Sequence, residues 1–453
     1  AAALTAAAAL VGCGASHFDD LARVGLHHGD AALAKARSPE TVLKLHLMKD
    51  KGLKTKGAVC LDGSDAGFYF APASEPAHAK DWQIYFEGGG WCYDEMDCWG
   101  RSSVSTGTTK DRPATQGGSG LISDDCKINP DFCNFNRVYM IYCDGNSFSG
   151  NREEPLVVTG LDGKKKPLYF RGRRIMDAVL ETLMTMGLDK AENVMLTGCS
   201  AGGLATYLHT DYVYSWLQAA KIPMKKFGSV PVSGVFLLHN NVEGKPVYPE
   251  EMRNIFELAN STHGLNDRCI AAMSEQDRWR CNFAEVAYRY IQAPIFSFNS
   301  ALDQWSTGCI LTSELDAGYP NQKDTANGRC AAAPGWAACS NDPEACSTVQ
   351  VGSLNSWIND FQRALNGSVT YTKAGNGAFI HSCHTHCEAQ DDHWFNTFAV
   401  NGVTMQQALS KWWHSDGSES AQQHTYHPCT YHAEAPTKRC NPTCAPFANP
   451  LVV

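Results

Sequence analysis

Short apolar runs recur along the chain, and turn-forming residues separate them. Four of these runs predict β-strands, each followed closely by a glycine, cysteine or polar turn: 82–86, 137–142, 193–197 and 294–298. Their apolar residues are nearly continuous instead of alternating with polar ones. This pattern is typical of strands that are covered on both faces, as in a parallel sheet.

Helical periodicity lies between the predicted strands. Segment 174–186 carries apolar residues on one side, and segment 204–220 directly follows a glycine-rich turn. Segment 39–51 is compatible with a helix or an extended lead-in. Alternation of strand, turn and helix predicts an α/β fold with a mostly parallel central sheet flanked by helices.

Cysteine content changes the picture of where the protein folds. The chain has 19 cysteines in 453 residues, a high count that favours disulfides and an oxidising compartment, hence a secreted protein. The odd number leaves at least one thiol unpaired or bridged to another chain. Segments 305–350 and 415–453 are rich in turns and cysteines, and we expect disulfide-stapled insertions there. Sequons at Asn260 and Asn366 are candidate glycosylation sites, so we expect a glycoprotein.

We expect one domain over 45–453, because no linker-like stretch divides this range. Residues 1–14 are small and apolar, and we interpret them as a signal-peptide remnant or a disordered N-terminus. An alternative is a lipobox ending at Cys13, which would then carry a lipid. No other segment is long and apolar enough to predict a membrane span.

Charge argues against a nucleic-acid partner, because the formal net charge is −9. Two local basic clusters, 164–166 and 171–174, are interpreted as a solvated loop and the start of a helix.

The strongest chemical motif is Gly198-Cys199-Ser200-Ala201-Gly202. It lies between a predicted strand and a predicted helix, which is the context of a nucleophile elbow. Such a turn exposes its central serine at the carboxyl end of the sheet. Taken by pattern alone, the turn could also be a tight strand–helix connection with a capping serine.

A serine nucleophile needs a general base and a group that orients the base. Asp303 follows a predicted strand and is a candidate acid, although a turn or capping aspartate would look the same. Candidate histidines are crowded into 381–393, where they alternate with Cys383 and Cys387. A metal site is the alternative for this cluster, but the spacing matches no common zinc motif.

An oxyanion hole needs backbone N–H groups that point at the developing negative oxygen. One donor is expected from Ala201, the residue after the nucleophile. The others are expected from Gly89 and Gly90, in a glycine loop that follows the strand at 82–86.

Taken together, these motifs resemble the pectin acetylesterase family of plants, which also includes the animal Notum carboxylesterases. The match runs in order from about residue 45 to the end of the chain. Its main stretches are 56–63, 87–92, 142–150, 170–174, 198–204, 299–305, 379–387 and 440–444.

The resemblance implies an α/β-hydrolase-like fold and the removal of O-acetyl groups from cell-wall pectin. It implies Ser200 as nucleophile, Asp303 as acid and His386 as base. It also implies a disulfide between Cys92 and Cys98. The sequence departs from the plant pattern at two further histidines, 381 and 384, where those enzymes commonly have asparagine and an aromatic or other residue.

We therefore predict a secreted, monomeric serine carboxylester hydrolase of the cell wall that needs no cofactor. Its expected partner is an acetylated polysaccharide, most specifically pectin, or another acyl ester. Three alternatives remain open: a Notum-like deacylase of a lipid-modified protein, a metal-dependent hydrolase that uses the 381–393 histidines, and an inactive binding protein.

Overall fold

The computed structural model describes residues 42–48, 55–160, 162–314, 323–324, 329–417, 423–427, 430–434 and 438–444. The interpretations of residues 1–14 and of Cys13 lie outside the described residues. A ten-stranded sheet forms the centre, in the order β16-β13-β10-β9-β8-β3-β5-β2-β1-β4. Its strands are β1 Leu43–Leu47, β2 Gly67–Ala71, β3 Asp81–Phe86, β4 Thr115–Gln116, β5 Asn136–Met140, β8 Asn193–Cys199, β9 Lys226–Val232, β10 Phe296–Ser300, β13 Gly377–His381 and β16 His424–Tyr426.

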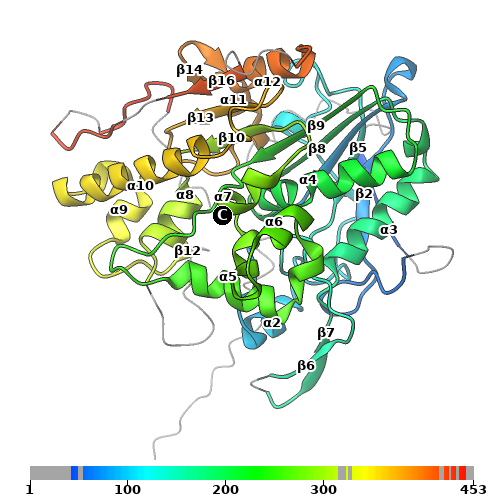
Figure 1. Ribbon diagram of the computed structural model, residues 1–453, viewed down its shortest axis with the longest axis horizontal. Helices are drawn as coiled ribbons and strands as arrows, with labels where there is room; N and C mark the ends of the chain where they lie inside the picture. Colours follow the sequence, from blue (N-terminus) through cyan, green and yellow to red (C-terminus); the bar gives the residue numbers. More distant parts are fainter. Residues whose placement is uncertain are drawn as a thin grey trace, which may run out of the picture.

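The seven strands from β16 to β5 pair in parallel, and β2, β1 and β4 extend the sheet with antiparallel pairs. The four predicted strands correspond to β3, β5, β8 and β10. In β3, β5 and β10 every residue is buried, which explains their nearly continuous apolar sequence. Figure 1 shows the labelled strands following one another across the molecule from β13 to β2.

Helices cover the sheet, and the predicted α/β-hydrolase-like architecture with disulfide-stapled insertions is confirmed. The two predicted helices are present as α3 and α4, and α4 packs against β8 and β9. The helices are α2 Glu95–Arg101, α3 Gly172–Met184, α4 Ala201–Ala219, α5 Val247–Leu258, α6 Asp267–Ala272, α7 Ala284–Ala287, α8 Gln304–Ser306, α9 Ala337–Asn341, α10 Thr348–Asn366, α11 Asp392–Thr397 and α12 Met405–His414. Of the expected segment 39–51 the structure describes 42–48, and there the extended alternative is correct, because β1 occupies Leu43–Leu47.

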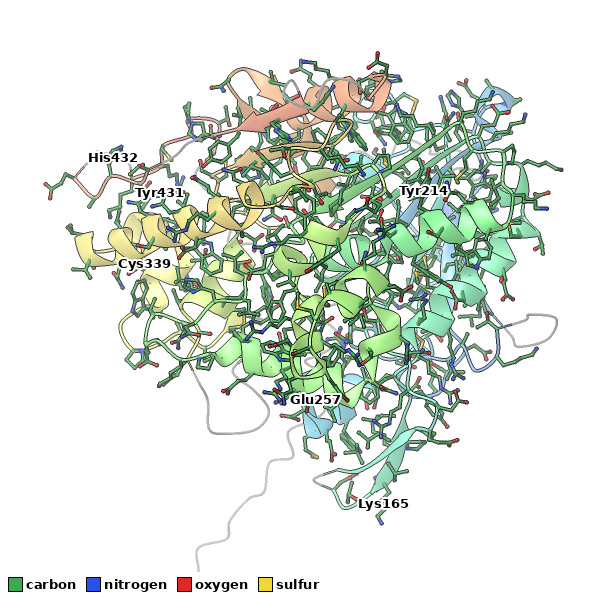
Figure 2. All side chains as sticks on the ribbon, viewed as in Figure 1. Lys165, Tyr214, Glu257, Cys339, Tyr431 and His432 are labelled. Atoms are coloured by element: carbon green, nitrogen blue, oxygen red, sulfur yellow. A yellow bond between two sulfur atoms is a disulfide. The ribbon has the colours of Figure 1, made fainter. Side chains whose placement is uncertain are left out.

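In the described part of the chain, three small two-stranded sheets lie outside the main sheet: β6 Leu156–Thr159 with β7 Lys165–Leu168, β11 Lys323–Asp324 with β12 Arg329–Cys330, and β14 Ala399–Val400 with β15 Val403–Thr404. The β6–β7 hairpin projects from the body and carries the exposed Lys165 (Figure 2). The second basic cluster opens α3, where Arg174 pairs with Glu153 and Arg173 with Asp177. The second cluster therefore matches the predicted helix start, whereas the predicted loop at 164–166 is wrong in part, because Lys165 and Lys166 belong to strand β7.

Eight disulfides join cysteines of the described residues: 60–143, 92–98, 126–133, 199–387, 269–281, 309–330, 339–346 and 383–444. Such a number indicates folding in an oxidising compartment, as for secreted proteins. Within the described part of the chain, none of the helices has the length and apolar character needed to cross a bilayer.

Candidate active site

Ser200 lies between the end of β8 and the first residue of α4. Its backbone angles are φ 60° and ψ −126°, a region that non-glycine residues adopt only under strain. The flanking glycine at 202 permits this turn, because a side chain there would collide with the carbonyl oxygen of Phe86 on β3. The local geometry is that of a nucleophile elbow, with Ser200 9% exposed.

Asp303 and His386 lie at the same edge of the sheet as Ser200. Ser200, Asp303 and His386 follow the parallel strands β8, β10 and β13, and the carboxyl ends of parallel strands meet at one edge. The Oδ2 of Asp303 is 2.7 Å from the Nδ1 of His386. The other carboxylate oxygen, Oδ1, accepts the N–H of Ser306 at 2.8 Å, so Asp303 also caps α8. These two bonds fix the orientation of the carboxylate.

His386 is almost fully enclosed, at 7% exposure. Burial lowers its pKa, but the charge and the hydrogen bond of Asp303, aided by the charge of Glu388, raise the pKa above its usual value of 6.5. Among the residues that the structure describes, nothing forms a hydrogen bond with the Nε2 of His386. The ring is therefore oriented at one nitrogen and available for proton transfer at the other.

A disulfide ties the serine turn to the histidine turn. It joins Cys199, which precedes Ser200, to Cys387, which follows His386, with a Cα–Cα distance of 5.7 Å. Cys387 has φ 61°, and neighbouring Ser233 has φ 46° while its Oγ accepts the N–H of Cys387 at 3.1 Å. Three non-glycine residues with positive φ thus meet around this bridge, and such clustering of strain is common at functional sites.

The glycine loop after β3 lies against the serine turn. A side chain at Gly88 would approach the Cβ of Ser200 to 3.0 Å. Further along, Arg101 donates to the carbonyl of Gly89 at 2.8 Å, and the hydroxyl of Tyr142 donates to that of Gly90 at 2.8 Å. The N–H of a trans peptide points opposite to its carbonyl, so the N–H groups of Gly90 and Trp91 point away from these two side chains.

Within the described residues, the N–H groups of Gly90 and Trp91 have no acceptor in the protein. A second network fixes the loop: Trp91 Nε1 donates to Ser147 Oγ at 2.7 Å, and that hydroxyl donates to the carbonyl of Ala201 at 2.8 Å. Ser147 links the loop to the first residue of α4. Trp91, Ser147 and Arg101 were not predicted from sequence as site residues, because only their contacts in three dimensions identify them.

Aromatic rings pack tightly beside His386. Phe236 lies 6.4 Å from the imidazole, measured between ring centroids. It contacts Trp91 and Trp305 at 5.0 Å each, and those two rings are 5.4 Å apart. Tyr248 closes the group at 5.8 Å from Trp305. We call Trp91, Phe236, Tyr248 and Trp305 the aromatic cluster.

The histidines of 381–393 take different positions. His386 is the one that bonds Asp303, whereas His381 bonds Glu388 and His393 is exposed on α11. Cys383 and Cys387 are both in disulfides, so their sulfurs are not thiolate ligands. Among the residues that the structure covers, no group of three or more His, Cys, Asp or Glu side chains has a metal-binding arrangement.

Comparisons with known proteins agree with this architecture. A solved structure titled Wnt deacylase Notum from Drosophila matches with a TM-score of 0.66 at 23% identity, covering 86% of this chain and 97% of that one. This likeness defines the fold as that of a Notum-like α/β-hydrolase.

Sequence comparison then gives the family. The model of the family described as Pectinacetylesterase matches residues 36–444. Pectin acetylesterase 11 of Arabidopsis thaliana is 30% identical over 393 residues, which are 86% of this chain and 90% of that protein. The human palmitoleoyl-protein carboxylesterase NOTUM is 26% identical over 414 residues, 89% of this chain and 73% of that protein. The chain belongs to the pectinacetylesterase family and is a carboxylic ester hydrolase.

Proposed function

We propose that this protein is a secreted serine esterase that removes O-acetyl groups from pectin or another cell-wall polysaccharide. Ser200 is the nucleophile, His386 the general base and Asp303 the residue that orients the base. The observation that carries this proposal is the 2.7 Å bond between Asp303 and His386 at the strand edge that also holds the strained Ser200 turn.

The reaction proceeds in two halves. The Oγ of Ser200 bonds to the carbonyl carbon of the ester while its proton moves to His386 Nε2. The carbonyl oxygen becomes negative in this step. Collapse of this intermediate breaks the bond to the sugar oxygen, which leaves with the proton from His386. Water, deprotonated by His386, then attacks the acetyl-serine and releases acetate and free Ser200. Asp303 holds the required tautomer and stabilises the imidazolium in both halves.

The oxyanion is stabilised by backbone N–H groups of Ala201, Gly90 and Trp91. Arg101 and Tyr142 hold the carbonyls of Gly89 and Gly90, which leaves the N–H groups of Gly90 and Trp91 pointing the other way. This supports Gly90 as an oxyanion donor, as expected from sequence, and adds Trp91 as a further donor. For Gly89, the other expected donor, no comparable contact orients the N–H. Loss of one such donor typically costs about 100- to 1000-fold in rate.

The aromatic cluster favours a substrate whose acyl group is short. Its rings contact one another at centroid distances between 5.0 and 6.4 Å, and all but Trp305 are almost fully buried. Space beside His386 is therefore filled by side chains, which suits an acetyl group better than a long lipid chain. The names of the Arabidopsis relatives, with similar length and 30% identity, favour pectin as the acetylated polymer.

The test measures acetate release from acetylated pectin, together with hydrolysis of 4-nitrophenyl esters of increasing acyl length. We expect release by the wild-type protein, a preference for acetyl over octanoyl ester, and no release by Ser200→Ala. Ser123→Ala removes a buried hydroxyl on another loop and is the matched control, with expected wild-type activity. An active, folded Ser200→Ala variant would overturn the mechanism, and a preference for long acyl chains would overturn the substrate class.

A further inference from the structure

A second carboxylate lies in the turn that carries His386. Glu388 begins the short helix Glu388–Gln390, and its Oε1 is 2.8 Å from the Nε2 of His381, the last residue of β13. Both side chains are completely buried. The pair therefore closes a loop of the chain, 382–387, which contains His386.

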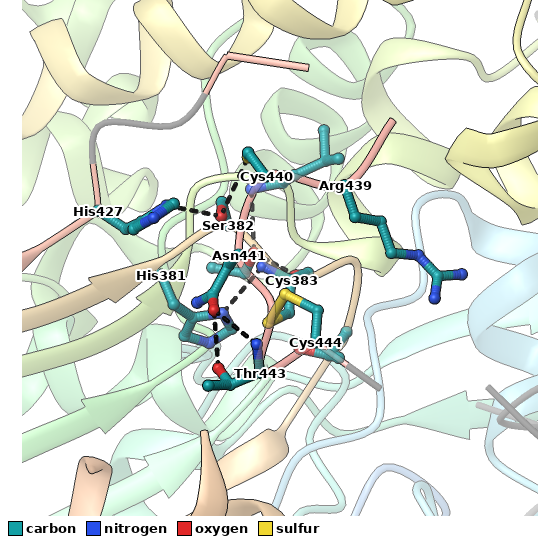
Figure 3. Close-up of a disulfide and its surroundings, with 12 residues drawn as sticks. His381, Ser382, Cys383, His427, Arg439, Cys440, Asn441, Thr443 and Cys444 are labelled. Carbon is teal, nitrogen blue, oxygen red and sulfur yellow. Dashed lines mark hydrogen bonds between the residues drawn. A yellow bond between two sulfur atoms is a disulfide. The ribbon is translucent and has the colours of Figure 1, made fainter. Parts of the chain in front are cut away.

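The contacts of His381 give its two ring nitrogens different partners. The N–H of Cys383 donates to His381 Nδ1 at 3.1 Å, as Figure 3 shows beside the Cys383–Cys444 disulfide. With Nδ1 on this N–H, the other nitrogen, Nε2, is the one that donates to Glu388. His381 thus orients the carboxylate of Glu388 through Nε2.

The second oxygen of Glu388 has donors of its own. The hydroxyls of Ser233 and Thr385 each lie 3.3 Å from Oε2. Burial raises the pKa of Glu388, but His381 and the backbone N–H of Glu388 outweigh burial and hold this pKa below its usual value. The carboxylate is therefore ionised over the range in which a histidine titrates.

Glu388 reaches His386 in two ways. Through Ser233, whose Oγ accepts the N–H of Cys387, it fixes the backbone directly after His386. Through space, its charge adds to that of Asp303 in favouring the protonated imidazole of His386.

We propose that Glu388, oriented by His381, is a positioning residue that fixes the His386 turn and supplies a second negative charge to the imidazolium that forms during catalysis. This inference rests on the proposed function. Titratable groups on the surrounding elements are Asp303 before α8, His381 on β13, His384 in the same turn and His427 after β16. His427 bonds Ser382 at 3.2 Å and has its pKa lowered by burial and by His381.

The test compares the pH profile of kcat/KM for an acetyl ester in the wild-type protein and in Glu388→Gln, Glu388→Asp and His381→Asn. In Glu388→Gln, we expect the acidic limb to move to lower pH, because His386 loses a neighbouring negative charge. We also expect the plateau to fall by about tenfold, well below the roughly 100- to 10,000-fold contribution of a general base itself. Glu388→Asp keeps the charge and should retain the wild-type limb.

His381→Asn should shift the limb in the same direction as Glu388→Gln. Without His381, burial raises the pKa of Glu388, so the carboxylate carries less negative charge beside His386. His381→Asn also tests the proposal if Glu388→Gln fails to fold. The matched control is Asp131→Asn. It removes the carboxylate of another histidine–carboxylate pair, in which Asp131 Oδ1 lies 2.8 Å from Nε2 of His414 on α12. This control should leave the profile unchanged.

A plateau that falls in Glu388→Gln and His381→Asn without movement of the limb would overturn the proposal, since a purely structural role would do the same. A wild-type profile in both variants would overturn it equally. Neither result affects the proposed function, which instead fails if Ser200→Ala remains active.

Discussion

Cys199 and Cys387 are joined by a disulfide although 188 positions separate them in sequence. One precedes Ser200 and the other follows His386, so the two turns of the proposed nucleophile and base share one covalent link. Glycine-loop packing against Ser200 and the Asp303 bond to His386 complete the arrangement.

Removal of this bridge should impair the reaction. We expect Cys199→Ser with Cys387→Ser to lower the free energy of unfolding by about 2–4 kcal/mol, the usual contribution of a disulfide that closes a long loop. We also expect kcat/KM to fall by about 100-fold, the cost of a displacement on the order of 1 Å between reacting groups. Chemical denaturation and acetyl-ester kinetics measure both effects.

The control is the Cys126→Ser and Cys133→Ser pair, which opens a disulfide of sequence separation 7. This variant should keep wild-type kcat/KM. Equal losses of activity in the two double variants would contradict a specific role for the Cys199–Cys387 bridge.

Asp303→Asn should separate orientation of the base from folding. Asparagine keeps the oxygen that caps α8 but gives the Nδ1 of His386 the wrong partner, so we expect kcat to fall by about 10,000-fold. The melting temperature should stay close to wild type. A loss of kcat below about tenfold would show that Asp303 does not orient the base.

The pH dependence of activity follows from His386. Burial lowers its pKa, but Asp303 and Glu388 raise the pKa above 6.5, and the base must be neutral to accept a proton. Activity should therefore decline as pH falls, with half of the maximal kcat/KM at a pH above 6.5. A midpoint at or below 6.5 would contradict this electrostatic description.

The aromatic cluster should limit acyl length. Replacing Trp305, its partly exposed member, with alanine should raise kcat/KM for a butyryl ester relative to an acetyl ester by about tenfold or more, since each accommodated methylene contributes on the order of 1 kcal/mol. Phe132→Leu, in a cluster with Phe135 and Trp413, is the control and should leave the ratio unchanged. An unchanged ratio in Trp305→Ala would mean that the cluster does not line the acyl site.

Much of the fold was predictable from sequence because its central strands are continuous apolar runs that end in glycine or cysteine turns. β9 was not predicted, because its sequence contains Gly228 and Pro231, which weaken the strand pattern. The strained turn at Ser200 was predictable from its local sequence, whereas the role of Ser200 as nucleophile stays a prediction. The choice of His386 needed the family resemblance, since spacing alone did not distinguish it from His381 or His384.

Contacts between distant segments could not be predicted in the same way. The connection between Cys199 and Cys387 depends on β8 and β13 ending at one edge, with β9 and β10 between them. Pairing of His381 with Glu388 likewise depends on how the 382–387 turn folds back. Neither pairing follows from the local sequence, because both depend on the tertiary structure.

Labelling by a fluorophosphonate, followed by peptide mapping, tests the central claim most directly. We expect modification of the peptide that contains Ser200, unaffected by a chelator, and strongly reduced labelling in His386→Gln. Labelling at another residue, or a folded wild-type protein that does not react, would contradict the assignment of Ser200 as the nucleophile.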